Sequence, residues 1–226
     1  MNIQQVYDNI ASEFDKTRYQ IWPVIKKFLD FLPSNSDVGD IGCGNGKNMI
    51  LSRKDLNFKG MDLSNEFVKI CISKGLNVIQ GNILNIPFDD ASLDNAMSIA
   101  VIHHLEKRAD RITAIKELLR ITKIGGEILI YVWAFEQPIG SKRQFLTTDE
   151  MVPYKTKSGE IYYRYYHLYQ QDELESELNE INIYNCDYDY KISKSGYDYD
   201  YDYEISKSGY DYGNYYIIIK KVLQST

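Results

Sequence analysis

A glycine-rich loop is the strongest chemical signal in this sequence. Residues 40–46 read Asp-Ile-Gly-Cys-Gly-Asn-Gly, directly after an apolar run and before a helix that starts near Lys47. Glycines permit a tight turn and let the backbone approach a ligand closely. The spacing GxGxG differs from the GxGxxG fingerprint of dinucleotide-binding proteins. The loop therefore predicts a small-molecule site at the end of the first strand.

Two polar residues follow the next two predicted strands. Asp62 lies at the end of the run 58–63, where a carboxylate can accept two hydrogen bonds from ribose hydroxyls. Asn82 follows the run 77–80, and its amide both donates and accepts, as an adenine edge requires. In isolation, Asp62 is also compatible with a helix-entry cap and Asn82 with a turn. In this order after a glycine loop, they predict a nucleoside site.

A histidine pair and an aromatic run follow later strands. His103 and His104 come directly after the run 94–100, at the strand end where ligands of open α/β sheets bind. A lone histidine is more often structural, but in this pair we expect one functional member and favour His104. Tyr165, Tyr166 and His167 either pack as an aromatic strand or stack on an unpaired nucleobase.

The elements that position these residues predict the fold. Strands at 38–41, 58–63, 77–80, 94–100 and 127–133 alternate with helices that start near Lys47, near Ser64 and at about Lys107. This alternation predicts a parallel, doubly wound α/β sheet with helices on both faces. Helices are also predicted at 4–17, from Trp22 to before Pro33, and at 171–181. The segment 134–160 shows no clear periodicity.

The C-terminal part carries an internal repeat. Residues 188–200 recur as residues 201–213 with differences at two of thirteen positions. The alternation of Tyr and Asp is a strand pattern. A recent duplication that yields a hairpin or a loop is favoured over a binding role. With a strand at 215–222, two late strands are expected to form an antiparallel hairpin on the sheet edge, which makes seven strands.

Composition narrows the class of protein. The 226 residues suit one domain, and 44% of them are hydrophobic, which is enough for a core. No apolar run approaches the roughly 20 residues of a membrane helix, and no signal peptide is recognisable. Cys43, Cys71 and Cys186 have scattered spacings that predict neither disulfides nor a metal site. We therefore expect a cytoplasmic location, with a nuclear one also open.

Charge is unevenly distributed along the chain. The net charge of −6 argues mildly against nucleic acid binding. The stretch 184–212 holds seven acids and three lysines, however, and so contributes four of those six charges. The rest of the chain is nearly neutral and leaves room for a basic patch. Because its negative charge would repel RNA, the Tyr/Asp repeat is expected to lie away from any RNA site.

The motif order in residues 37–134 resembles the class I S-adenosylmethionine-dependent methyltransferases. The resemblance implies a Rossmann-like fold, with Asp40 and the glycines near the amino acid part of the cofactor, Asp62 at ribose and Asn82 near adenine. It predicts one methyltransferase domain with N-terminal helices (1–36), a cofactor-binding core (37–134), a substrate-side segment (135–182) and a C-terminal hairpin (183–226). The predicted cofactor contacts are Tyr7, Asp40, Gly42, Cys43, Gly44, Gly46, Asp62, Leu63, Asn82, Ile83 and Ser98.

Three further segments narrow the resemblance. They are Thr17-Arg18-Tyr19-Gln20-Ile21-Trp22-Pro23, the histidine pair with residues 131–137, and Val152-Pro153-Tyr154 with Tyr163-Arg164-Tyr165-Tyr166-His167-Leu168-Tyr169. Together they resemble the eukaryotic tRNA wobble-uridine carboxymethyl methyltransferases, AlkB-homologue methyltransferase domains included. The resemblance implies methyl esterification of 5-carboxymethyluridine in the tRNA anticodon loop. It also implies a heterodimer with a small zinc-binding activator subunit, without which this chain is expected to be poorly soluble or weakly active.

This chemistry assigns provisional roles to basic residues. An arginine fork suits a carboxylate, and Arg18 is the first candidate and Arg164 the second. His103 and His104 complete the predicted catalytic set. Five residues are candidate phosphate contacts, although a solvated loop is the default reading for such charges: Lys142, Arg143, Lys155, Lys157 and Arg164.

Three rival functions remain in view. A methyltransferase acting on a small molecule or a protein would share the cofactor core. A nicotinamide oxidoreductase is disfavoured by the GxGxG spacing, and a non-catalytic scaffold by the intact motifs. Tyr154, Tyr215 and Tyr216 stand where the resembling family often has tryptophan.

Overall fold

The apolar runs form one sheet in the computed structural model, which describes residues 1–186 and 201–223. The strand order is β3-β2-β1-β4-β5-β9-β8. Its members are β1 (Asp37–Ile41), β2 (Asn57–Asp62), β3 (Val78–Gln80), β4 (Asn95–Ile99), β5 (Glu127–Trp133), β8 (Tyr201–Tyr210) and β9 (Asn214–Leu223). The first five strands are parallel to their neighbours, and β9 pairs antiparallel with both β5 and β8. The predicted fold class is confirmed, down to the C-terminal antiparallel hairpin.

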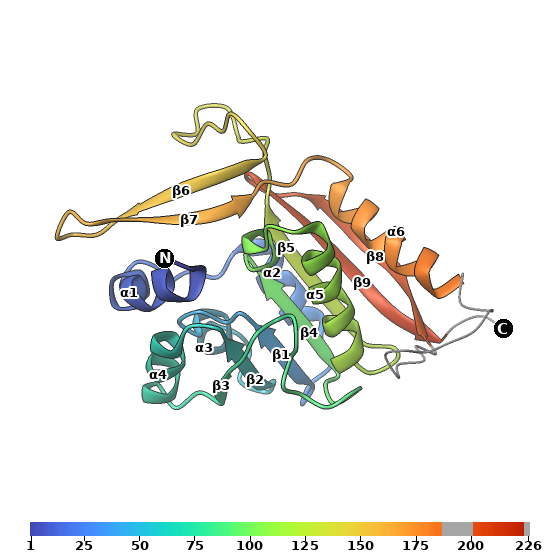
Figure 1. Ribbon diagram of the computed structural model, residues 1–226. Helices are drawn as coiled ribbons and strands as arrows, with labels where there is room; N and C mark the ends of the chain where they lie inside the picture. The colour runs from blue at the N-terminus through green and yellow to red at the C-terminus, as the bar shows by residue number, and fades with distance from the viewer. Residues whose placement is uncertain (187–200, 224–226) are drawn as a thin grey trace.

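Helices cover both faces of the sheet (Figure 1). The helices are α1 (Ile3–Asp15), α2 (Pro23–Phe31), α3 (Lys47–Leu51), α4 (Asn65–Ser73), the 3-10 turn η1 (Ile102–His104), α5 (Arg108–Ile121) and α6 (Glu173–Cys186). On one face, Ile25 and Phe28 of α2 pack against Leu129. On the other, Ile115 of α5 and Leu178 of α6 pack in the cluster that holds Ile128 and Ile130. None of the helices in the described ranges has the length and apolar character needed to cross a membrane.

A buried ion pair fixes α6 against α5. Arg111 Nε donates to Glu177 Oε1 at 2.7 Å, and the Tyr169 hydroxyl donates to Glu177 Oε2 at 2.9 Å. Arg111 and Glu177 are both almost completely buried. Loss of one member would leave the other buried charge with only a more distant partner at 3.7 Å, Glu173 for Arg111 or Arg108 for Glu177. Breaking a buried pair in this way costs up to roughly 3–5 kcal/mol. This pairing anchors the segment 135–182 to the cofactor-binding core.

The segment without clear periodicity contains a strand that sequence patterns missed. Strands β6 (Asp149–Lys155) and β7 (Ile161–His167) form a separate antiparallel hairpin. No residue of β6 is fully buried, and its half-buried face combines Glu150 with Val152 and Tyr154, so hydrophobic residues do not alternate clearly along β6. The hairpin projects as a ribbon beside α1 (Figure 1), and Glu13 Oε2 accepts a 2.9 Å hydrogen bond from the Lys157 amide at its turn.

Candidate active site

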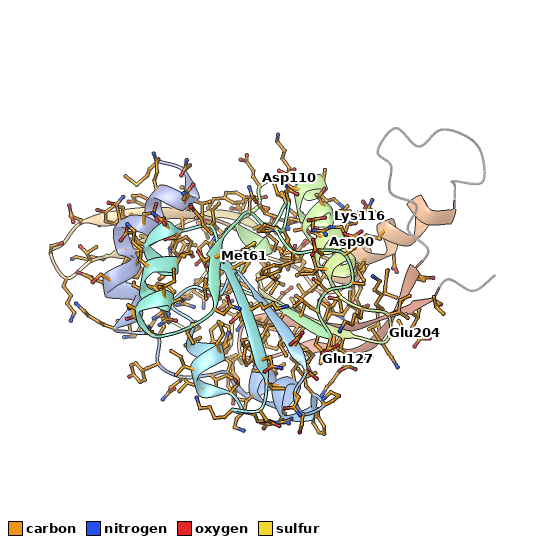
Figure 2. All side chains as sticks on the ribbon, turned by 90° about the horizontal axis from the view of Figure 1, so that it is seen from below. Met61, Asp90, Asp110, Lys116, Glu127 and Glu204 are labelled. Atoms are coloured by element: carbon orange, nitrogen blue, oxygen red, sulfur yellow. The ribbon has the colours of Figure 1, made fainter. Side chains whose placement is uncertain are left out.

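A cavity of about 710 Å³ lies at the carboxyl ends of the parallel strands. Met61 lies at this end of β2, whereas Glu127 and Glu204 lie toward the other end of the sheet (Figure 2). The cavity brings together eleven of the fifteen residues in the predicted cofactor-binding and catalytic sets. They are Tyr7, Arg18, Gly42, Cys43, Gly44, Asp62, Leu63, Asn82, Ile83, His104 and Arg164.

Four predicted site residues do not line this cavity. Gly46 is the N-cap of α3 with φ +74°, so its role in the structure is to turn the chain. Ser98 and His103 are buried beneath the surface of the cavity, as is Asp40. Ser98 and His103 are therefore not among the residues that line the cavity.

The glycine loop is shaped by contacts that exclude larger side chains. Gly42 has φ +81°, and a Cβ there would lie 2.3 Å from Val101 Cγ2. Gly44 has φ +54° and no atom within 4 Å of the position its Cβ would take, so this edge of the loop is open. The amides of Gly42 and Cys43 both donate to the Met61 carbonyl, at 2.7 and 2.9 Å. The loop is thus held to β2 with its Gly44 edge facing the cavity.

Two buried carboxylates lie beneath and beside the loop. Asp62 accepts from the Gly44 amide at 2.7 Å and from the Ser64 amide at 2.9 Å. Burial nevertheless raises the pKa of Asp62 to about 6. Asp40 is fully buried, and neither of its carboxylate oxygens has a hydrogen-bond partner among the described residues. Burial and then the charge of Asp62 raise the pKa of Asp40 to about 7.

These groups fit S-adenosylmethionine. The unpaired buried Asp40 and the buried Asp62 supply negative charge toward a ligand with a net positive charge, and the open Gly44 edge admits close approach. Asn82 lines the cavity with its Oδ1 accepting from the Leu84 amide at 3.0 Å, which leaves its NH₂ group for a ligand. No group of three or more His, Cys, Asp or Glu in the described part of the chain is arranged to hold a metal ion.

His104 is fixed as a neutral imidazole. Its Nδ1 lies 2.8 Å from the Tyr165 carbonyl, which only accepts, so Nδ1 carries the proton. Its Nε2 therefore accepts from the Tyr7 hydroxyl at 2.7 Å. Burial lowers the pKa of His104 to about 3. Both ring nitrogens are thus occupied, and His104 holds Tyr7 in place rather than offering a free base.

His103 has a structural position. The Trp133 amide donates to His103 Nδ1 at 3.1 Å, and the imidazole stacks on Tyr166 with ring centroids 4.7 Å apart. Burial, with the neighbouring charges, holds the pKa of His103 well below its usual range. Of the pair, His104 is the member that reaches the cavity, as the sequence favoured.

The aromatic run of β7 divides between two surroundings. Tyr166 is buried and lines the cavity, with its ring centroid 4.5 Å from that of Trp133. The Tyr165 hydroxyl donates to Asp149, and His167 contacts Asp149 and Glu173 on the outer side. Neither Tyr165 nor His167 lines the cavity, and their contacts with Asp149 and Glu173 favour the packing alternative for these two residues. Alternation along a strand sends adjacent side chains to opposite faces.

Three arginines converge on the cavity without a carboxylate partner. Arg18, Arg143 and Arg164 all line it, and none forms an ion pair with a described residue. Aromatic rings hold them: Arg143 lies 4.2 Å from the Trp133 centroid, and Arg164 lies 5.5 Å from that of Tyr154 and 5.2 Å from that of Tyr166. Arg164 is 6% exposed, and its buried Nε has no hydrogen-bond partner in the described chain. This arrangement suits an anionic ligand.

Sequence patterns missed several members of the site. Lys47 lies 4.6 Å above the Trp22 ring, and burial lowers its pKa to about 8. Asp211, Tyr212 and Asn214 also line the cavity. The expectation that the Tyr/Asp repeat lies away from the substrate is therefore wrong for the end of its second copy, because the β8–β9 turn closes over the carboxyl end of β5. The first copy, 188–200, lies outside the described residues. Of the predicted phosphate contacts, Arg143 and Arg164 reach the cavity and the lysines do not.

Comparison with known proteins agrees with this geometry. Residues 39–130 match the methyltransferase domain family. A solved S-adenosylmethionine-dependent methyltransferase from Clostridium acetobutylicum superposes with a TM-score of 0.66 at 13% identity, covering 95% of this chain and 98% of that one. The solved complex of the Haloferax volcanii Trm112 methyltransferase activator with a methyltransferase gives a TM-score of 0.50 at 26% identity, over 57% of this chain and 61% of that one. Fold and site define a class I methyltransferase, and S-adenosylmethionine is confirmed as its cofactor.

Curated relatives define the family more narrowly. The tRNA (carboxymethyluridine(34)-5-O)-methyltransferase of Schizosaccharomyces pombe is 37% identical over 193 residues, which cover 76% of this chain and 84% of that protein. The Arabidopsis thaliana protein of that name is 45% identical over 135 residues, 60% of this chain. This chain belongs to the tRNA (carboxymethyluridine(34)-5-O)-methyltransferase family, as the sequence motifs predicted. It matches only 33% of the length of the Arabidopsis relative and 20% of a mouse relative.

Proposed function

We propose that this chain transfers a methyl group from S-adenosylmethionine to the carboxylate of 5-carboxymethyluridine at the tRNA wobble position. The product is the 5-methoxycarbonylmethyl ester. Family membership supports this substrate, and one observation carries it: three arginines without acidic partners surround the cavity that also holds the cofactor residues. The positive charge of these arginines favours an anionic substrate over a neutral one.

The residues present suit a nucleophile that needs no base. A carboxylate has a pKa near ~4 and is already ionised at neutral pH. The bound cofactor supplies an electrophilic methyl group on a sulfonium. Arg164 holds one carboxylate oxygen and leaves the other free to react, while the aromatic walls exclude water. Such positioning can supply roughly 7–11 kcal/mol of barrier reduction. The neutral, fully bonded state of His104 agrees with a reaction that has no proton to remove.

Tyr7 is predicted to position the substrate half of the site. Its hydroxyl donates to His104 and interacts with Arg164 and Tyr166. A Tyr7→Phe variant should lower kcat for tRNA by about tenfold, the effect of losing one hydrogen bond near a charged group. Its affinity for S-adenosylmethionine, measured by calorimetry, should stay within twofold of the native value (about 0.4 kcal/mol). A large loss of cofactor affinity with unchanged kcat would instead make Tyr7 a cofactor residue, the role that the motifs predicted.

A small activator subunit, zinc-binding as in the resembling family, is part of the proposal. The Haloferax complex supports a partner of this kind for a chain with this core. Strand β3 is short and ends the sheet, and Ile79 on it and Ile72 on α4 are 39% and 57% exposed. Covering this edge would bury both. We propose a heterodimer that works on tRNA in the cytoplasm, with the nucleus as a second location.

The decisive assay uses labelled S-adenosylmethionine and tRNA that carries carboxymethyluridine, with and without the activator. Label on the wobble base that mild alkali releases is the expected result, because esters hydrolyse readily in alkali. Transfer to protein or to a small acid, with none to tRNA, would contradict the proposed substrate while leaving the methyltransferase class intact.

A further inference from the structure

The turn between β8 and β9 reaches the active-site cavity from a part of the chain that the cofactor motifs do not include. β8 and β9 join at the end of the sheet from which the β6–β7 hairpin departs (Figure 1). Asp211, Tyr212 and Asn214 of this turn line the same cavity as Arg18 and Arg143. The turn belongs to the second copy of the Tyr/Asp repeat, which no family motif covers.

This turn is fixed to the body of the protein. The Asp211 carboxylate accepts from the buried Tyr131 hydroxyl at 2.8 Å. The Gly213 carbonyl accepts from the Ala134 amide at 2.9 Å and from Gln137 Nε2 at 3.2 Å. Asn214 Nδ2 donates to the Asp211 carbonyl at 3.0 Å and to the Tyr212 carbonyl at 3.2 Å. The turn is therefore a built wall of the cavity, and the carboxylate of Asp211 is directed at Tyr131.

One of the two differences between the repeat copies lies in this turn. Gly213 has φ +84°, and a Cβ there would lie 2.7 Å from Gln137 Oε1. The first copy has Asp200 at the matching position. An aspartate at 213 would displace Gln137 from its two hydrogen bonds. The difference between the copies is thus located where the docked turn requires a glycine.

Tyr212 is held in an unfavourable conformation with its ring in solvent. Its φ is +44°, in the left-handed region that bulky residues rarely adopt, and its side chain is 84% exposed. Tyr19, 71% exposed, also lines the cavity. An exposed aromatic ring at the mouth of an arginine-lined cavity is suited to a splayed nucleobase. We infer that Tyr212 stacks on the base next to the modified uridine, an inference that rests on the proposed function.

The test compares three substitutions in the chain with its activator, on tRNA carrying carboxymethyluridine. Tyr212→Gly removes the ring and suits the positive φ, so its effect cannot come from backbone strain. It should raise KM for tRNA by about tenfold, within the range for loss of one stacked base. Tyr212→Phe keeps the stacking face and should match the native chain. Phe31→Ala, which removes an 85% exposed ring at the far end of α2, should also have no effect.

A direct readout separates stacking from other effects. 2-Aminopurine placed on either side of the modified uridine should lose fluorescence on binding the native chain and the Tyr212→Phe variant, and keep it with Tyr212→Gly. If the native chain transfers methyl groups to tRNA, and the Tyr212→Gly variant shows the same KM and the same fluorescence quenching as the native chain, this inference alone is overturned. Absence of transfer by the native chain with its activator would overturn the proposed function and this inference with it.

Discussion

Replacement of Arg164 by methionine is expected to lower kcat/KM for the tRNA substrate by about 10²–10³-fold, because the substrate carboxylate loses its buried partner. Arg164 is the deepest of the three cavity arginines, and its Nε has no partner in the described chain. Affinity for S-adenosylmethionine should change little, since the glycine loop, Asp62 and Asn82, to which cofactor binding is assigned, remain intact. Steady-state kinetics and calorimetry measure the two effects separately.

Stability distinguishes a functional Arg164 from a structural one. A buried cation without an acidic partner costs folding free energy, and apolar replacement of buried ionic groups is often neutral or stabilising by roughly 1–4 kcal/mol. Methionine has a similar length and can fill the space between Tyr154 and Tyr166. The Tm of the Arg164→Met chain should therefore equal or exceed the native value while activity is lost. A fall in Tm with activity retained would show that Arg164 supports the fold.

Arg143 provides the matched control. It also lines the cavity and packs on an aromatic ring, but its side chain is exposed. Water already screens an exposed charge, so an Arg143→Met variant should lose only about three- to tenfold in kcat/KM, mainly through KM and mainly at low salt. Equal losses in the two variants would contradict the separate role assigned to Arg164. An Arg164→Lys variant keeps the charge without the planar fork and should fall between native and Arg164→Met.

The parallel core was predictable because its signals are local. Strands β1, β4 and β5 are almost entirely buried, and a glycine or a polar residue ends or follows β1, β2 and β3 at the cavity end: Gly42, Asp62 and Gly81. The glycine loop, Asp62 and Asn82 could therefore be placed together before any coordinates were known. The strand order of doubly wound sheets then places these strand ends at one edge.

The substrate half was less predictable because its positions depend on packing between distant segments. No residue of β6 is fully buried, so no clear periodicity marked it as the partner of β7. Tyr165 and Tyr166 are adjacent in sequence, yet one faces Asp149 and the other the cavity. Asp211 and Tyr212 reach the site only through the pairing of β9 with β5. Net charge gave the opposite expectation for the repeat, because it does not show where each carboxylate is directed: that of Asp211 accepts a hydrogen bond from Tyr131.

Cofactor affinity is expected to rise with pH between 5.5 and 7.5. Burial raises the pKa of Asp62 to about 6 and that of Asp40 to about 7, above the ordinary value near ~4. The protonated forms are therefore favoured in the free folded chain at pH 5.5. A cofactor with a net positive charge binds the ionised forms better, so the Asp40 and Asp62 carboxyl groups must release their protons when it binds. Linkage of this kind predicts roughly ten- to a hundredfold weaker binding at pH 5.5 than at pH 7.5.

The same shifts act with the opposite sign on the stability of the free chain. The unfolded state releases these protons near pH ~4, whereas the folded state keeps them to about pH 6 and 7. The contribution of these carboxylates to stability is thus complete below the unfolded pKa and is lost as pH rises through the folded values. These two carboxylates should therefore lower the Tm of the free chain as pH increases from 5 to 7. The increase in Tm produced by saturating cofactor should become larger over the same pH range.

Asparagine variants assign the pH dependence to its carboxylates. Asp40→Asn removes the group with the higher pKa, so the change in cofactor affinity between pH 6.5 and 7.5 should disappear, while the dependence below pH 6.5, set by Asp62 with its pKa of about 6, should remain. Asp62→Asn should weaken binding at every pH, because it also removes the acceptor for ribose. It should leave only the dependence set by Asp40, displaced to lower pH because the charge of Asp62 no longer raises the pKa of Asp40. Calorimetry at constant ionic strength measures both. A native affinity that is flat from pH 5.5 to 7.5 would mean that the two carboxylates are already ionised in the free chain, with the charge of the neighbouring Lys47 offsetting the burial of Asp40.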